Sequence, residues 1–387
     1  MKKKIAIVTK KMILGGIEKV LLSMLLDIDK EKYDVTIFLE EKGGVLEEDI
    51  PSWIKIEYIF EECKSIREDL LVSLKKFNII DFIKLFYSGV RIYTLKEEYK
   101  IYKDRCSILP KRKEKYDIAI SYHNPMNLST LYVIDKLNAD KKVMWIHTDI
   151  EKYSKQVDYF KTYYYKYDKI FTVSPGAYRA FCGKYPDLSE KTEVFYNRIV
   201  KSEIVSKIDG KNYYEDFDGI KVLTVGRICY EKAIDLIPEI SRKLKDDGYK
   251  FKWYCVGWGG IERIRELIKK YDVEDCFILL GSSKNPYNYM KNCDIYVQPS
   301  RYEGYVTTIT EAKCFERPIV ATNIEGIKEQ IVNEKTGILV ECSVDELYTG
   351  VKKLIDDESL RNKLSVNLSK ENIDTRSEIN KLYKLIN

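Results

Sequence analysis

A chain of 387 residues is too long for one typical hydrophobic core, so its length predicts two domains. Hydrophobic residues make up 45% and charged residues 33%, which is typical of a globular protein and excludes a disordered one, and no apolar run is long enough to span a bilayer. The net charge of +5 is too modest to indicate a nucleic-acid partner.

The first half of the chain is predicted to alternate strands and helices. Lys4–Thr9 is a short β-branched strand, and the loop after it carries Gly15-Gly16 before an apolar run at helical spacing. Strand, Gly-Gly loop and helix open a doubly wound α/β unit, whose ligands bind outside the carboxyl ends of the strands. A plain turn explains the two glycines equally well. The full G-x-G-x-x-G spacing is missing, which counts against a dehydrogenase.

A basic passage follows the third predicted strand. From about Ser65 to Arg105 the sequence is predicted to be helical, with aromatic residues among the lysines. Residues 64–115 contain fourteen Lys or Arg against seven Asp or Glu. Basic and aromatic residues on amphipathic helices are typical of peripheral attachment to an anionic membrane surface. An ordinary solvated helical face covering the sheet is the equally good alternative.

The rest of this half contains the first candidate catalytic residue. The predicted strand Lys142–Ile146 ends at His147, at the carboxyl end where an α/β site needs such a group. Six tyrosines between Tyr153 and Tyr167 suit either a domain-facing surface or a sugar-stacking wall. The strands predicted in residues 1–197 are 4–9, 34–39, 54–59, 116–122, 142–146, 169–174 and 192–196, and the polar passage 198–219 is predicted to be a linker.

A second α/β series begins at Ile220. Its first strand ends in Gly226-Arg227, and Lys232 follows at the predicted start of a helix. Two cations at the carboxyl end of a strand are suited to neutralise a diphosphate. The further strands predicted are 251–256, 277–280, 295–297 and 319–321, the tail from Glu341 is predicted to be helical, and the second domain is predicted to span 220–369.

The stretch Ser300–Glu311 is the most informative in the chain. It follows a strand, and a helix is predicted to begin at Thr307, so Glu303 should lie in the loop and Glu311 inside the helix. The bare amides at a helix start favour an anion such as phosphate. Two carboxylates on either side of that start therefore predict a site for a ligand with both hydroxyls and phosphates, such as a nucleotide-sugar. Two solvated surface glutamates are the alternative.

Taken together, these motifs resemble the retaining GT-B glycosyltransferases of family four, above all those that build bacterial capsular, exopolysaccharide or lipopolysaccharide chains. The motifs run in order from Gly15-Gly16 through His147, Val225-Gly226-Arg227 with Lys232, Val256-Gly257 and Glu303-Gly304 to Glu311, Ala321-Thr322 and Gly337. The resemblance implies two Rossmann-like doubly wound domains facing across a cleft. It also implies that residues 370–387 form a helix that crosses back to the first domain.

The resemblance implies a function as well. The protein would transfer a sugar, with retention, from a UDP-linked nucleotide-sugar to a lipid-linked or oligosaccharide acceptor, without a cofactor or a metal ion. Nine cysteines without a Cys-x-x-Cys pair and only two histidines agree with a reducing cytoplasm and disfavour a zinc site. The expected location is therefore cytoplasmic, at the inner face of the membrane if the basic region 64–115 attaches there.

Individual roles also follow from the resemblance. Arg227 and Lys232 would bind the diphosphate and stabilise it as it leaves, while Glu303 would contact the donor sugar and Glu311 the ribose hydroxyls. His147 would lie at the sugar face. The catalytic residues implied are Arg227, Lys232, Glu303 and His147, and the donor-binding residues are Gly15, Gly16, Gly226, Ser283, Gly304, Val306, Thr307 and Glu311.

The chain departs from the family pattern at three positions. Ala233 follows Lys232 where glycine is usual, Val306 replaces the second glycine of the E-G-x-G form, and Glu325 takes the first position of a usual Gly-Gly. Two other functions fit the same fold. One is a nucleotide-sugar 2-epimerase, which needs no acceptor, and the other is a non-catalytic partner subunit of another transferase, which the intact cations and carboxylates disfavour.

Overall fold

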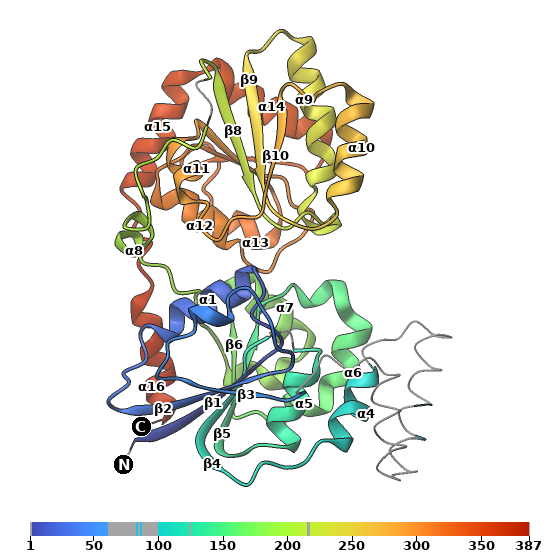
Figure 1. The fold of residues 1–387 in the computed structure, drawn as a ribbon, viewed down its shortest axis with the longest axis vertical. Helices are drawn as coiled ribbons and strands as arrows, with labels where there is room; N and C mark the ends of the chain where they lie inside the picture. The colour runs from blue at the N-terminus through green and yellow to red at the C-terminus, as the bar shows by residue number, and fades with distance from the viewer. Residues whose placement is uncertain are drawn as a thin grey trace. The chain divides into compact units, whose positions relative to one another are not determined.

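The computed structural model describes residues 2–60, 83, 86, 100–123, 125–214 and 217–386, which form two compact units (Figure 1). The first unit contains Met1–Tyr196 and Ser377–Asn387, and the second contains Asn197–Arg376. The backbone therefore passes between the units twice. Each unit is built around one sheet in which all the paired strands are parallel.

The first unit has a seven-stranded sheet in the order β3-β2-β1-β4-β5-β6-β7. The central strands are apolar on both faces, as expected when helices cover both sides of a parallel sheet. The strand order reverses between β1 and β4, so the carboxyl ends of these two strands mark the expected ligand-binding point. The strands are β1 (Lys3–Thr9), β2 (Tyr33–Leu39), β3 (Lys55–Tyr58), β4 (Lys115–Ser121), β5 (Asn138–Ile146), β6 (Lys169–Thr172) and β7 (Thr192–Val194).

Helices pack on this sheet, and the last of them comes from the end of the chain. The Tyr383 ring stacks on Tyr33 with ring centroids 5.1 Å apart, and its hydroxyl donates to the carbonyl of Asp27 at 2.6 Å. The C-terminal helix is therefore part of the first unit. The helices of this unit are α1 (Gly16–Leu25), α4 (Ile101–Ile108), α5 (Leu128–Asp135), α6 (Ser154–Tyr164), α7 (Pro175–Lys184) and α16 (Ile379–Ile386).

The second unit has a six-stranded sheet in the order β10-β9-β8-β11-β12-β13, which reverses between β8 and β11. Successive residues of one strand face opposite sides of the sheet. Trp253 accordingly packs in the apolar cluster on one face and Tyr254 in the cluster on the other. The strands are β8 (Ile220–Val225), β9 (Phe251–Val256), β10 (Phe277–Gly281), β11 (Ile295–Gln298), β12 (Ile319–Thr322) and β13 (Ile338–Val340).

Helices cover both faces of this second sheet (Figure 1). Buried residues of α9, α10 and α14 belong to one apolar cluster, and those of α11 and α12 belong to the other. The helices of this unit are α8 (Lys201–Val205), α9 (Ile237–Asp246), α10 (Ile261–Tyr271), α11 (Tyr287–Asn292), α12 (Thr307–Cys314), α13 (Glu325–Lys328), α14 (Val344–Asp356) and α15 (Glu358–Ser369).

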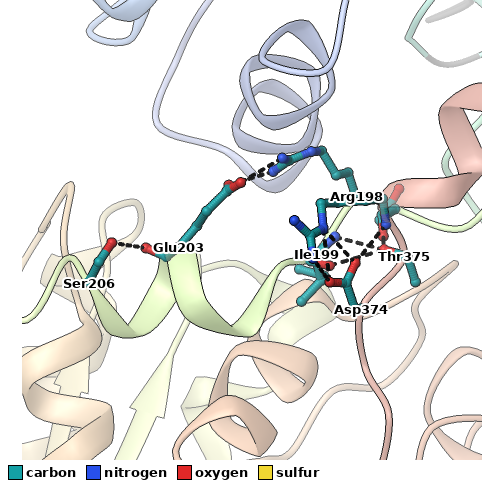
Figure 2. Close-up of polar contacts among 8 residues, drawn as sticks. Arg198, Ile199, Glu203, Ser206, Asp374 and Thr375 are labelled. Carbon is teal, nitrogen blue, oxygen red and sulfur yellow. Dashed lines mark hydrogen bonds and ion pairs between the residues drawn. The ribbon is translucent and has the colours of Figure 1, made fainter.

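The first and last segments of the second unit are tied to each other, as Figure 2 shows. The backbone N–H of Thr375 donates to the carbonyl of Ile199 at 3.0 Å, and its Oγ1 accepts from the N–H of Ile199 at 2.8 Å. Beside them, the buried guanidinium of Arg198 binds both carboxylate oxygens of Glu203, at 2.6 and 2.7 Å. The two passages of the backbone between the units therefore start from one hydrogen-bonded cluster.

The predicted fold of two doubly wound parallel-sheet domains is confirmed. Three details differ. Strand β13 was missed, because a run of three apolar residues is too short to show a period. The predicted linker 198–219 lies within the second unit and contains α8. Of the six tyrosines in 153–167, Tyr164 and Tyr167 are buried in the core of the first unit, so these two contribute neither to a domain-facing surface nor to a sugar-stacking wall.

The basic passage cannot be compared with the structure over most of its length. Most of the predicted helical stretch from Ser65 to Arg105 lies outside the described residues, and α4 overlaps its end. Within the parts of the chain that the structure describes, no helix combines the length and the apolar character that crossing a membrane requires.

Candidate active site

The candidate site of the second unit lies at the carboxyl ends of β8 and β11, where the strand order reverses. Gly226 and the exposed Arg227 directly follow β8. The neighbouring loop after β9 comes so close that a Cβ on Gly257 would lie 1.9 Å from the carbonyl oxygen of Gly226. Glycine at position 257 is thus what lets the two loops pack together, and a side chain there would push away the loop that carries Arg227.

Lys232 is held in a short turn and not at the start of an α-helix. It ends a 3₁₀ turn (Tyr230–Lys232), and α9 begins five residues later, at Ile237. A second 3₁₀ turn (Ile234–Leu236) follows and leads into α9, so the chain is helical close to the predicted start at Ala233, but the regular α-helix begins four residues after that position. Ala233 adopts the left-handed backbone conformation, with φ of 52°, and is completely buried. Glycine adopts this conformation without strain, which explains physically why glycine suits this position.

Lys232 and Glu303 are in direct contact. The Lys232 Nζ donates to Glu303 Oε1, and the hydroxyl of Ser300 donates to the same carboxylate oxygen at 2.7 Å. Both side chains of the ion pair are largely buried, with 21% and 12% of their surfaces exposed. The structure thus brings together one predicted cation and one predicted carboxylate from loops 71 residues apart in the sequence.

The predicted helix start after Glu303 is confirmed. Helix α12 begins at Thr307, and Val306 precedes it with an ordinary extended backbone, φ of −103° and ψ of 99°. The Val306 side chain packs into an apolar cluster of the second unit. Valine at the position of the family's second glycine therefore causes no backbone strain, and the helix N-terminus still offers its unpaired amides.

Glu311 lies within α12 and is 5% exposed. Its Oε1 accepts a hydrogen bond from the hydroxyl of Tyr287, at the start of α11, at 3.1 Å. Burial raises the pKa of Tyr287 well above its usual value, with the Glu311 charge as the next cause, so the phenol keeps its proton and stays a donor. Tyr287 carried no sequence signal, because this partner becomes visible only when α11 and α12 pack together.

Gly326 is a second residue that the sequence did not single out. A Cβ at this position would lie 2.4 Å from the carbonyl oxygen of Glu303. The start of α13 therefore packs directly against the backbone of the Glu303 loop. Of the two positions that are usually Gly-Gly in the family, only position 326 requires a glycine here, because Glu325 carries its side chain at the surface, where it pairs with Lys328.

The remaining predicted donor-binding residues of the second unit lie in loops at the same edge of its sheet. Gly304 follows Glu303 directly. Ser283 is in the loop after β10, where its Oγ accepts from the N–H of Asn285 at 3.2 Å. This hydrogen bond shapes the loop that leads into α11 and Tyr287. The predicted ligand contacts of Gly226, Ser283, Gly304, Val306 and Thr307 stay predictions.

Gly15, Gly16 and His147 belong to the first unit, at the carboxyl edge of its own sheet. Gly15 precedes α1 in an extended conformation, and a Cβ there would lie 2.3 Å from Oε2 of Glu18. The buried carboxylate of Glu18 thus closes on the glycine loop, and its Oε1 lies 3.9 Å from Nε2 of His123. A side chain at position 15 would displace the Glu18 carboxylate from this position.

His147 directly follows β5, as predicted. The residue as a whole is only partly buried, yet its Nε2 atom is completely buried and has no hydrogen-bond partner in the part of the chain that the structure describes. Burial, with a smaller contribution from the neighbouring His123, lowers the pKa of His147 to about 3. The imidazole is therefore neutral at neutral pH, and it can donate or accept one hydrogen bond but cannot supply a positive charge.

Most of the second unit is similar in sequence to a family of known proteins. Residues 211–371 match the sequence family described as glycosyl transferases, group 1. An uncharacterized glycosyltransferase of Methanocaldococcus jannaschii, MJ1059, is 26% identical over 274 residues, which cover 66% of each chain. The N-acetylgalactosamine-N,N'-diacetylbacillosaminyl-diphospho-undecaprenol 4-alpha-N-acetylgalactosaminyltransferase of Campylobacter jejuni is 28% identical over 204 residues, 51% of this chain and 53% of that protein.

A solved structure agrees over the whole chain. HepE from Anabaena in complex with UDP-glucose has a TM-score of 0.71 at 15% identity, covering 98% of each chain. The matched segments span between about half and two thirds of the two curated relatives. The fold is thus that of the GT-B glycosyltransferases, and the segment similar to the group 1 family, residues 211–371, lies within the second unit.

Proposed function

We propose that the protein is a retaining glycosyltransferase that transfers a hexose from a UDP-sugar to a lipid-linked or oligosaccharide acceptor in surface polysaccharide synthesis. The observation that carries the proposal is the contact between Lys232 and Glu303 at the switch point of the second sheet. Lys232 and the exposed Arg227 both follow β8, and the N-terminus of α12 lies at the same edge of the sheet. They are the groups that a departing diphosphate requires.

The chemistry follows from these charges. When the bond between the sugar and the diphosphate breaks, negative charge builds up on the phosphate oxygens, and Arg227 and Lys232 stabilise it. The proposed site needs no metal, because two fixed cations and the α12 amides supply the positive potential. The proposal assigns no protein nucleophile. The departing phosphate takes the acceptor's proton as the acceptor hydroxyl attacks from the same face, so the anomeric configuration is retained.

Donor and acceptor are inferred from relatives. The HepE structure contains UDP-glucose, which supports a UDP-linked donor. The name of the C. jejuni relative contains a diphospho-undecaprenol acceptor, which supports a lipid-linked acceptor. Attachment to an anionic membrane through residues 64–115 and action at its cytoplasmic face stay predictions, because most of that region lies outside the described residues.

A two-step experiment tests the proposal. Thermal unfolding with a panel of UDP-, GDP- and ADP-sugars identifies the donor, because a ligand that binds only the folded state raises the melting temperature. Incubation of that donor with polyprenyl-diphosphate-linked sugars, in buffer with EDTA, is expected to give a glycosylated lipid whose new linkage keeps the donor's anomeric configuration. Conversion of the donor without an acceptor would indicate an epimerase instead. Binding of no nucleotide-sugar would contradict the proposal.

A further inference from the structure

We propose that Gln298 and Ser300 are positioning residues that orient the Glu303 carboxylate toward Lys232. This inference rests on the proposed function, in which Glu303 contacts the donor sugar. Both residues are completely buried, so neither touches the donor, and both act through Glu303. The sequence assigns neither of them a role: Gln298 is the last residue of β11, and Ser300 begins the stretch that contains Glu303.

The network starts at the Gln298 side chain. Its Oε1 accepts hydrogen bonds from the hydroxyl of Tyr296 at 2.9 Å and from Oγ1 of Thr308, on α12, at 3.1 Å. Its Nε2 donates to Oγ of Ser300 at 2.8 Å. Two hydroxyl donors on the oxygen side leave the amide nitrogen to face Ser300. The strand β11 and the helix α12 together thus set the orientation of the amide.

The orientation of the amide decides where the Ser300 proton points. A serine hydroxyl carries one hydrogen, and its oxygen can accept while that hydrogen is donated elsewhere. Ser300 accepts from Gln298, so its own hydrogen is directed to Oε1 of Glu303, 2.7 Å away. Glu303 then accepts from Ser300 and from Lys232. Two donors on one carboxylate oxygen hold the side chain in a single rotamer, and the acceptor is charged, which makes these bonds strong.

The opposite orientation of the amide predicts a different site. With the Gln298 oxygen facing Ser300, the serine hydrogen would be donated to Gln298, and Glu303 would lose one of its donors. The substitution Gln298→Glu imitates that state with almost no change in shape, because a carboxylate can only accept. A glutamate carboxylate at position 298 would be surrounded by three hydroxyl groups that can donate to it, those of Tyr296, Ser300 and Thr308.

The experiment compares three variants with the wild type. Ser300→Ala deletes the hydrogen bond to Glu303, and Gln298→Glu reverses the hydrogen bond between residues 298 and 300, so that the Ser300 hydroxyl donates to residue 298 and no longer to Glu303. Ser241→Ala is the matched control: Ser241 is equally buried in the same unit, but its hydroxyl has no hydrogen-bond partner among the described residues. Thermal unfolding establishes that each variant is folded. For each, kcat and KM of the transfer reaction and the dissociation constant of UDP are measured.

We expect kcat to fall at least about tenfold in Ser300→Ala and in Gln298→Glu, the effect of losing one hydrogen bond to a charged group. The dissociation constant of UDP should stay within about twofold, because Arg227 and Lys232 remain. Ser241→Ala should behave as the wild type. A general loss of structure would lower UDP binding along with kcat, whereas mispositioning of Glu303 lowers kcat alone.

The outcomes separate this inference from the proposed function. If the wild type transfers sugar and both network variants keep the wild-type kcat, the positioning role is overturned and the proposed function stands. An equal loss of kcat in Ser241→Ala also overturns the positioning role. If the wild type neither binds UDP nor transfers sugar, the proposed function fails, and this inference fails with it.

Discussion

The ammonium group of Lys232 is bound by the carboxylate of Glu303, so the site without ligand neutralises the cation that the proposed mechanism needs for the diphosphate. A donor must therefore compete with an internal carboxylate before its phosphate reaches Lys232. The hydroxyl of Ser300 donates to the same carboxylate oxygen of Glu303. Glu303 therefore keeps one hydrogen-bond donor when Lys232 turns toward the phosphate. Removal of the Glu303 charge is therefore predicted to strengthen the binding of UDP and to lower the rate of sugar transfer.

Substitution of Glu303 by Gln should tighten UDP binding and slow transfer. Removal of the competing charge frees Lys232, and a partly buried ion pair of this kind corresponds to about 1 kcal/mol, or roughly fivefold in the dissociation constant. Loss of the contact to the donor sugar should lower kcat. Isothermal titration with UDP and steady-state kinetics measure the two effects. The control is Asp345→Asn, which breaks the exposed ion pair with Lys243 and should change neither quantity.

Arg227→Ala and Lys232→Ala should each lower kcat by at least about a hundredfold, in the range found when one donor to a developing oxyanion is removed. Both cations are predicted to stabilise the leaving diphosphate. Lys243→Ala removes an exposed lysine of the same unit and serves as the control for a change in net charge. Near-normal turnover in both Arg227→Ala and Lys232→Ala would refute their assignment as catalytic residues.

Ala233→Gly should stabilise the second unit by about 1 kcal/mol, because alanine in the left-handed conformation costs about 1–2 kcal/mol and part of that gain is offset by the extra freedom of glycine when unfolded. The melting temperature should rise by about 2–4 °C. Ala312→Gly, a similarly buried alanine in regular helix α12, is the counter-example and should lose stability. Thermal unfolding followed by circular dichroism measures both, and a destabilised Ala233→Gly would contradict the strain argument.

Gly326→Ala should damage the Glu303 loop. Its Cβ would meet the Glu303 carbonyl oxygen at 2.4 Å, a backbone atom that cannot rotate away, so the loop must shift. We expect kcat to fall at least about tenfold and stability to drop by about 1–3 kcal/mol. Gly183→Ala in helix α7 is the control, because a Cβ there meets nothing within 4 Å, and it should leave activity unchanged and raise stability slightly. Equal effects of the two substitutions would argue against the close contact.

His147 predicts a pH dependence of stability. Its pKa falls from an ordinary 6.5 to about 3 in the folded state, so between these values the unfolded chain binds a proton that the folded protein does not. The contribution of His147 to the free energy of unfolding should therefore be fully present above about pH 6.5 and should decrease as the pH falls toward 3. His147→Gln should remove this part of the slope when melting temperatures are measured from pH 4 to 8. An NMR titration of the imidazole with a midpoint near 6.5 would contradict the low pKa.

The sequence by itself determined the alternation of strands and helices, the two sheets and the placement of Arg227, Glu303 and His147 after strands. These features depend on the local pattern of apolar residues and on the residues that end a strand, which are readable within about ten positions. The helix start at Thr307 was predictable for the same reason. Strand β13 and the four-residue delay of α9 were not predictable, because short runs carry no period.

Only the tertiary structure decided which groups meet. Tyr287 binds Glu311 from another helix, Gly326 packs on the carbonyl of Glu303, and the orientation of Gln298 is set jointly by a strand and a helix. The C-terminal helix finds its place in the first unit through Tyr383, more than 350 residues from Asp27 in the chain. Each of these contacts joins groups whose separation in sequence has no relation to their distance in space, and packing alone brings them together.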